Sequence, residues 1–346
     1  MTSASSTYVQ ARKPSRIGRP GIMAGAIVFL AIAIFASLAV GKGGVSVSMA
    51  MNAIFSPTSL SDAEAALMEL RVPRTLLAIL AGAALGVSGA IMQAVTRNPL
   101  SDPGILGINT GAALAMVLGF GFLGIDGGYG PVWLALLGGA LIAILVHAIG
   151  FAGSREAAPV RLTLAGVAIT AMLGGIVTAI LLLDPVKFDR MRGWNTGALS
   201  GADVNVILAI APFIAAGLLL AAFNTRSLNA LALGEDVARA MGANVTSARL
   251  VGGLAATLLA AAATAGAGPI AFIGLMVPHL VRGAAGADQR WTFAFTIVLS
   301  PALLLTADIL GRVLLRSGEI PAGIVMAVIG VPVFILLVGR EKGVLS

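Results

Sequence analysis

The stretch LNALALGEDVARAMG, residues 228–242, is a short polar island in a chain made mostly of long apolar runs. Gly234 divides the island, and we predict a short helix on each side of it. Glu235 and Asp236 suit the partial positive charge at the start of the second helix. Arg239 follows Glu235 by four residues, which is the spacing of a favourable ion pair on a helix.

The second predicted helix has one apolar face and ends early. Leu233, Val237 and Met241 fall on the same face, and Gly242 is a typical helix stop. Such an amphipathic pair of helices at a membrane face suits docking to a soluble protein. It equally suits a linker that lies on lipid headgroups, and these residues alone leave both interpretations open.

The composition indicates a membrane protein. The chain is 58% hydrophobic and 11% charged, whereas soluble domains contain about 25% charged residues. It has 44 glycines, and runs such as AGAALGVSGA would let helices approach closely in lipid. The absence of cysteine excludes disulfides and thiolate metal sites. The net charge of +7 comes from basic residues at segment ends, a pattern of membrane topology rather than of nucleic-acid binding.

Ten apolar segments approach the ~20 residues that are needed to cross the hydrocarbon core. They cover residues 23–40, 76–95, 105–123, 132–152, 162–183, 206–223, 250–267, 270–285, 293–310 and 320–338. The segment 270–285 is the weakest, because it is short and contains Pro278 and His279. We therefore predict an all-α polytopic membrane protein with about ten transmembrane helices over residues 21–346, preceded by a disordered basic cytoplasmic tail over residues 1–20.

The distribution of basic residues gives an orientation. With a cytoplasmic N-terminus and ten spans, 14 of the 22 lysines and arginines lie inside and 8 outside. This is the direction of the positive-inside rule. We expect a multi-pass protein of the cell membrane, with both termini and residues 228–242 in the cytoplasm.

The predicted spans contain few groups that could carry chemistry. Gln93 lies deep in the second span, and Asp308 lies near the outer end of the ninth. Because proton relays use buried carboxylates or histidines, a proton-driven secondary transporter is disfavoured, while sodium coupling through backbone carbonyls stays open. Neither a hydrolase motif nor a P-loop occurs. We expect no enzyme activity, cofactor or metal site, and any ATPase would be a separate chain that docks on the island.

Four stretches resemble one family, and they occur in that family's order. They are RVPRTLLAILAGAALGVSGAIMQAVTRNPLSDPGILGINTGAA (71–113), LALGEDVARAMG (231–242), GPIAFIGLMVPHLVR (268–282) and GEIPAGIVMAVIGVPVFILLV (318–338). They are similar to the iron-siderophore, haem and cobalamin permeases, the membrane subunits of type II ABC importers. The resemblance covers nearly everything after the N-terminal tail. It implies the type II importer permease fold, a homo- or heterodimer with the path at its interface, two cytoplasmic ATPase subunits and an extracytoplasmic binding protein.

The resemblance also implies roles for particular residues. Coupling to the ATPase would fall to the island, through Leu233, Gly234, Glu235, Asp236, Arg239 and Gly242. Docking of the binding protein would fall to Arg71, Arg74 and Arg312, since arginine binds carboxylates with a planar fork. The alternative is local pairing, for instance of Arg71 with Glu69 or of Arg312 with Asp308.

The cargo is less defined by the sequence. The stretches GINTGAA and WNTGALSG look most similar to those of ferric-siderophore members, although Trp194-Asn195-Thr196 departs from the wording of many members. Haem and cobalamin permeases share the same framework and remain alternatives, and a secondary transporter is a further one. In this family the binding protein selects the cargo, so no residue of the permease is expected to specify it.

Overall fold

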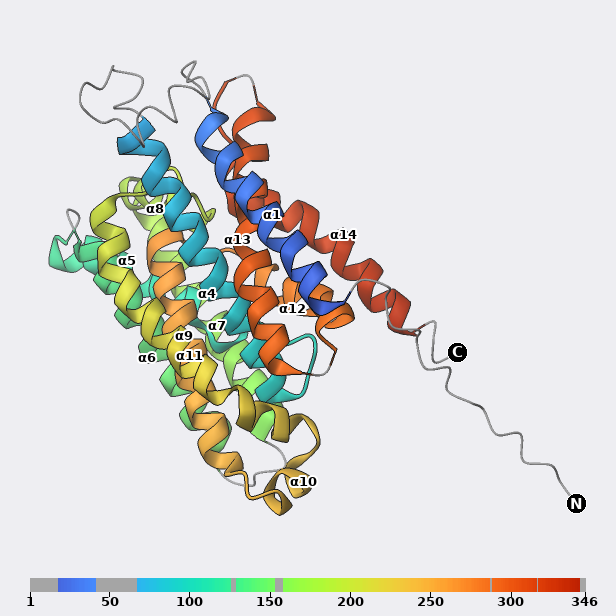
Figure 1. The fold of residues 1–346 in the computed structure, drawn as a ribbon. Coiled ribbons are helices and arrows are strands. Elements are labelled where there is room, and N and C mark those ends of the chain that lie inside the picture. Colours follow the sequence, from blue (N-terminus) through green and yellow to red (C-terminus); the bar gives the residue numbers. More distant parts are fainter. Residues whose placement is uncertain are drawn as a thin grey trace, which may run out of the picture.

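The computed structural model describes residues 18–41, 67–125, 129–152, 158–286, 288–315 and 317–342, and these residues form helices and no strand (Figure 1). The elements, in chain order, are α1 (Arg19–Ala39), η1 (Leu67–Arg71), α4 (Val72–Thr96), η2 (Pro103–Leu106), α5 (Ile108–Leu118), η3 (Gly119–Leu123), α6 (Gly130–Phe151), α7 (Ala158–Leu183), α8 (Pro185–Asn195), α9 (Val204–Ala232), α10 (Glu235–Ala240), α11 (Val245–Ala267), α12 (Ile273–Ala285), α13 (Gln289–Val313) and α14 (Ala322–Lys342). The short elements η1 and η3 are π-helical, and η2 is a 3₁₀ turn.

Each predicted span coincides with an apolar helix. Seven helices are long and apolar enough to cross a membrane. Three shorter ones, Ile108–Leu123, Ile273–Ala285 and Ala322–Leu336, coincide with the third, eighth and tenth predicted spans. The all-α, multi-pass membrane fold that the composition predicts is therefore confirmed.

Some helix boundaries differ from the prediction. α1 begins at Arg19, inside the predicted tail, while residues 1–17 lie outside the described part of the chain. α9 continues to Ala232, so the first of the two short helices predicted in the island is wrong. The helix continues because residues 224–233 contain no glycine or proline. The polar side chain of Asn224 is satisfied within the bundle by a 2.8 Å hydrogen bond to the Ala248 carbonyl. α8 was not predicted, because its charged sequence PVKFDRMRGWN has no apolar periodicity.

α4 is the central helix of the bundle. From Ala81 to Thr96 it is buried, and it packs against α9, α11, α12 and α13. Its glycines allow this close approach: a Cβ on Gly82 would lie 2.7 Å from Pro301 Cα of α13, and one on Gly89 would lie 2.3 Å from Gly274 Cα of α12. Helices thus meet backbone to backbone, as expected where association in lipid depends on packing.

Gln93 of α4 supplies a hydrogen bond that α12 lacks because it contains a proline. Pro278 has no N–H, so the carbonyl of Gly274 loses its donor within α12. The Nε2 of Gln93 donates to the carbonyls of Gly274 and Leu275, each at 3.2 Å. Arg282 in turn donates to Gln93 Oε1 at 2.7 Å. A helix with a proline can therefore lie at membrane depth because a neighbouring helix satisfies its backbone.

The bundle has two polar ends. One is the island end, where α10 lies at the bottom of Figure 1. Toward this end Asn229 of α9 lies 2.9 Å from Asp288, and Arg19 of α1 lies over the ring of Trp291 of α13. At the opposite end, which we call the arginine end, α1 and α13 finish beside the start of α4. The apolar parts of the long helices separate these two ends.

Substitution of Gly89 by alanine tests the close packing of α4. We expect Gly89→Ala to lower the free energy of unfolding by roughly 1–3 kcal/mol, because overpacking in a core has about this cost. The added methyl would overlap the Gly274 backbone, which cannot swing aside as a side chain can. Gly25→Ala in α1 is the matched control, since a Cβ there meets nothing within 4 Å. Unfolding in mixed micelles measures both, and equal stabilities would contradict the packing argument.

Candidate functional site

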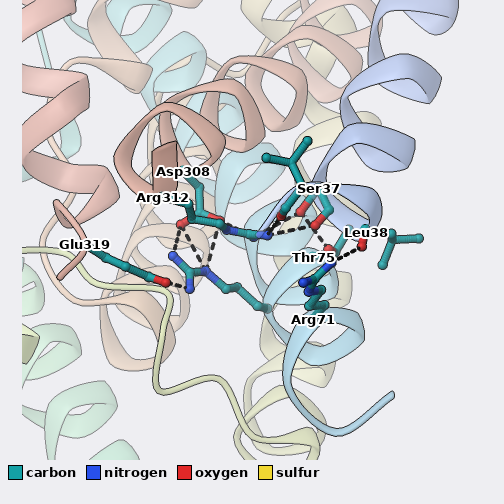
Figure 2. A network of polar contacts seen from close by, with 9 residues as sticks. Ser37, Leu38, Arg71, Thr75, Asp308, Arg312 and Glu319 are labelled. Atoms are coloured by element: carbon teal, nitrogen blue, oxygen red, sulfur yellow. Dashed lines mark hydrogen bonds and ion pairs between the residues drawn. The ribbon is translucent and has the colours of Figure 1, made fainter. Parts of the chain in front are cut away.

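A cluster of arginines and carboxylates lies at the arginine end, where α1, α4 and α13 meet (Figure 2). Arg71, the last residue of η1, and Arg74, in the first turn of α4, are three residues apart and so share a face. Arg312 lies in the last turn of α13, four residues after Asp308. The fold therefore brings together the three arginines that the family resemblance singles out.

Asp308 is the centre of this cluster. Arg74 Nε lies 3.1 and 3.0 Å from its two carboxylate oxygens, and Arg74 Nη2 lies 2.7 Å from Oδ1. Arg312 Nε lies 3.0 Å from Oδ2, and Arg312 Nη2 donates to the same oxygen. The Asp308 side chain is 0% exposed and that of Arg312 is 3% exposed. Buried charges persist when they are paired and hydrogen-bonded, so the local pairing of Arg312 with Asp308 is confirmed.

Two of the arginines also cap the C-terminal end of α1 by donating hydrogen bonds to its last carbonyls. Arg312 Nη1 donates to the Ser37 carbonyl at 2.7 Å. Arg71 Nη1 donates to the carbonyls of Leu38 and Ala39, at 2.8 and 3.1 Å. The last carbonyls of a helix have no partner within it and carry a partial negative charge. The guanidinium groups meet both needs and thereby fasten α1 to α4 and α13.

Glu319 completes the cluster on its exposed side. It belongs to the linker between α13 and α14, and its Oε2 accepts a 2.8 Å hydrogen bond from Arg74 Nη1. Its side chain is 33% exposed, against 13% for Arg74, while Arg71 and Arg312 are buried. The arginines expected to receive a partner protein are thus already bonded within the chain.

Sequence reasoning did not include Ser37, Thr75 or Glu319 in this cluster. The hydroxyls of Ser37 and Thr75 lie 2.8 Å apart and join α1 to α4. These residues come from segments far apart in the chain, so no local pattern links them to the arginines. The available signal was that the topology places Glu319 and Asp308 on the same side of the membrane as Arg71, Arg74 and Arg312.

The second polar cluster is the island itself. Gly234 has φ 108°, which confirms the predicted break, and Gly242 has φ 81° just after α10. Arg239 Nη2 lies 3.1 Å from Glu235 Oε2, which confirms the predicted pair. Arg249, buried in α11, also pairs with Glu235.

The island turns one carboxylate inward and the other outward. Glu235 faces α11 through Arg249, whereas the Asp236 side chain is fully exposed. Leu233, Val237 and Met241 are all exposed, so the predicted apolar face points away from the bundle. The pairing of Glu235 with Arg249 attaches α10 to α11, while Asp236 lies within 3.8 Å of Arg239 Nη1 on the exposed side of α10.

Asn229 and Asp288 fasten the island to the start of α13. Asn229 Nδ2 donates to Asp288 Oδ1 at 2.9 Å, and the Gln289 N–H donates to Asn229 Oδ1 at 2.7 Å. Hydrogen bonds from the Asn229 side chain and then from the Arg290 N–H lower the pKa of Asp288. The carboxylate therefore stays ionised and keeps α9 and α13 together.

Both clusters join helices by ion pairs and hydrogen bonds at helix ends. In the described part of the chain, no three histidine or carboxylate side chains come close enough to hold a metal ion. A bundle of apolar helices long enough to cross a membrane, with a polar cluster at each end, defines a multi-pass membrane protein. Residues 29–340 match the FecCD transport family, and the chain belongs to this family.

Similarity to known proteins extends over almost the whole chain. It is 43% identical over 318 residues to the ferric enterobactin transport system permease protein FepD of Escherichia coli, covering 92% of this chain and 94% of FepD. It is 35% identical to the hemin transport system permease protein HmuU of Yersinia pestis, covering 94% of this chain and 97% of HmuU. A solved inward-facing structure of a metal-chelate type ABC transporter superposes with a TM-score of 0.79 at 26% identity, covering 93% of this chain and 100% of that one. These relatives are transport permeases, and this chain is a transport permease subunit.

The central role of Asp308 predicts a large effect of its neutralisation. Asp308→Asn should lower the free energy of unfolding by about 3–5 kcal/mol, because it leaves the buried Arg312 without its counter-charge. Glu319→Gln is the matched control, since an exposed ion pair contributes about 0–1 kcal/mol. Unfolding of the two purified variants in mixed micelles tests this, and similar losses in both would contradict it.

Proposed function

We propose that this chain is the membrane permease of an ATP-driven importer of ferric siderophores, in which the chelate passes along the interface of two permease subunits. The proposal is carried by the family match over nearly the whole chain, with greater identity to a ferric enterobactin permease than to a hemin permease. The likeness to a metal-chelate type ABC transporter supports the broader class of cargo. Haem and cobalamin remain the alternative cargoes.

The island is proposed as the docking site of two cytoplasmic ATPase subunits, one for each permease. Its exposed apolar face, Leu233 with Val237 and Met241, suits insertion into a hydrophobic groove of a soluble partner. Asp236 and Arg239 lie at the edge of this face and contribute polar contacts. Gly234, Glu235 and Gly242 act differently: they set the shape and position of α10, so that movement of the ATPase is passed on to α9 and α11.

The arginine end is proposed as the docking site of the extracytoplasmic binding protein. Arg71, Arg74 and Arg312 outnumber their carboxylate partners Asp308 and Glu319 where α1 and α13 end and α4 begins. The net positive charge that remains attracts an acidic partner over a distance. The burial of Arg71 and Arg312 gives them a supporting role in this assignment. Arg74 is the member of the trio whose guanidinium bonds an exposed carboxylate, so direct contact is assigned to it.

Transport by purified components tests the proposed function. The permease is reconstituted in liposomes with an ATPase and a binding protein from the same organism, and uptake of ferric catecholates, ferric hydroxamates, ferric citrate, hemin and cobalamin is compared. We expect ATP-dependent accumulation of one class of ferric siderophore. Hemin or cobalamin uptake in its place would assign the alternative cargo. Uptake that needs no ATP and collapses with an ionophore would establish a secondary transporter instead.

Single cysteines in this cysteine-free chain test its orientation and the ATPase docking site. Asp236→Cys places a thiol on the exposed island, and Ser317→Cys places one at the exposed arginine end. In intact cells a membrane-impermeant maleimide should label position 317 and spare position 236. In inverted vesicles it should label position 236, and the ATPase should protect that site. Labelling of position 236 from outside would refute the orientation, and lack of protection would refute docking on α10.

A further inference from the structure

Arg74 holds two carboxylates that differ in how firmly they are attached to the protein. Its Nε and Nη2 donate to Asp308, and its Nη1 donates to Glu319 at 2.8 Å. Asp308 is completely buried within α13 and is shared with Arg312. Glu319 is exposed and lies in a non-helical linker just after Gly318, which has φ 82°. One side of the guanidinium is therefore permanently occupied, and the other is occupied by a group that can leave.

The position of Glu319 matches that of an external acidic ligand. Figure 2 shows Glu319 on the side of the cluster opposite α1, where its carboxylate accepts the bond from Arg74 Nη1. Arg74 Nη1 points to this carboxylate while Asp308 stays behind it, so the bond to Glu319 can be exchanged without disturbing the buried pair. Exchange of one carboxylate for another leaves Arg74 fully paired before and after, and the released Glu319 becomes solvated. No step requires an unpaired, partly buried arginine, which would be costly.

We infer that Glu319 is an internal stand-in for a carboxylate of the partner protein, and that this carboxylate displaces Glu319 from Arg74 when the partner docks. The inference rests on the proposed docking of an extracytoplasmic binding protein at the arginine end. It identifies the chemistry of the contact: an aspartate or glutamate on the partner's surface takes the Nη1 side of the guanidinium. Competition with Glu319 lowers the affinity of docking and favours release after each transport cycle.

Release of Glu319 would also loosen the part of the linker that precedes Ile320. From Ile320 onward the chain stays attached, because Ile320 N donates to the Gly311 carbonyl and Gly323 N donates to the Gly197 carbonyl, each at 3.0 Å. The bond to Arg74 is the ion pair that ties Glu319 to α4 among the described residues. Docking would therefore change the mobility of residues 317–319 while the remainder of the cluster stays fixed.

Binding measurements separate displacement from docking itself. The full-length permease with its ATPase, in nanodiscs, is titrated with the binding protein that supports uptake in the liposome assay. Glu319→Gln removes the competing charge and should tighten binding by about two- to fivefold, since exposed ion pairs are weak. Arg74→Lys keeps the charge that pairs with Asp308 but loses the fork, and should weaken binding about tenfold. Arg226→Gln, at an exposed arginine of α9 toward the island end, is the control for a general change of charge.

The results for the two variants distinguish displacement of Glu319 from docking at Arg74 alone. Tighter binding by Glu319→Gln with weaker binding by Arg74→Lys supports displacement. Unchanged or weaker binding by Glu319→Gln, with Arg74→Lys still weakened, overturns displacement and leaves docking at Arg74 intact. Unchanged binding in both variants overturns docking at Arg74 as well. A spin label on Ser317→Cys gives an independent readout: its mobility should be higher with Glu319→Gln than without it, measured before docking, when no partner covers the label. An unchanged spectrum would also overturn displacement.

Discussion

The structure depends on how closely α12 and α13 can approach α4. Helices in lipid gain little from hydrophobic burial against one another, so they associate through close packing. Gly82 meets the backbone at Pro301, and Gly89 meets the backbone at Gly274. The contact of Gly82 with Pro301 also sets the register of the antiparallel pair α4 and α13. Arg74 lies about two turns before Gly82 and Asp308 about two turns after Pro301, so this glycine contact brings the two charges to the same level.

The two polar ends use acidic residues in the same way. At each end one carboxylate is turned inward and holds two arginines: Asp308 binds Arg74 and Arg312, and Glu235 binds Arg239 and Arg249. The inward carboxylates fix helix ends in position. A second carboxylate at each end is more exposed, Glu319 at one and Asp236 at the other. In the proposed function, partners would act on the exposed groups while the inward pairs keep the helix ends in place.

Gln93 shows why a chain with so few polar residues in its spans can still tolerate an interrupted helix. Pro278 leaves the Gly274 carbonyl without a donor, and an unsatisfied carbonyl is expensive in lipid. A single amide from α4 supplies the bond, and Arg282 orients that amide. Gln93 thus maintains the backbone hydrogen bonding of α12 within the bundle.

Hydropathy and local spacing were enough to predict the ten apolar helices, the break at Gly234 and the pairing of Arg239 with Glu235. Each of these depends on residues within a few helical turns, where sequence order and distance in space coincide. The pairing of Arg312 with Asp308 is equally local, and the sequence offered it as an alternative.

By contrast, the bonds of Arg74 to Asp308 and Glu319 join residues that are 234 and 245 positions apart in the sequence. The hydrogen bond from Arg312 to the Ser37 carbonyl joins residues that are 275 positions apart. The full length of α9 was not predicted, because Asn224 indicates a loop unless its hydrogen bond to the Ala248 carbonyl is known. α8 was not predicted because its charged sequence has no apolar periodicity. The long-range bonds of Arg74 and Arg312 form because close glycine contacts fix the register of the neighbouring helices along α4. That register is a property of the packed bundle rather than of any one segment.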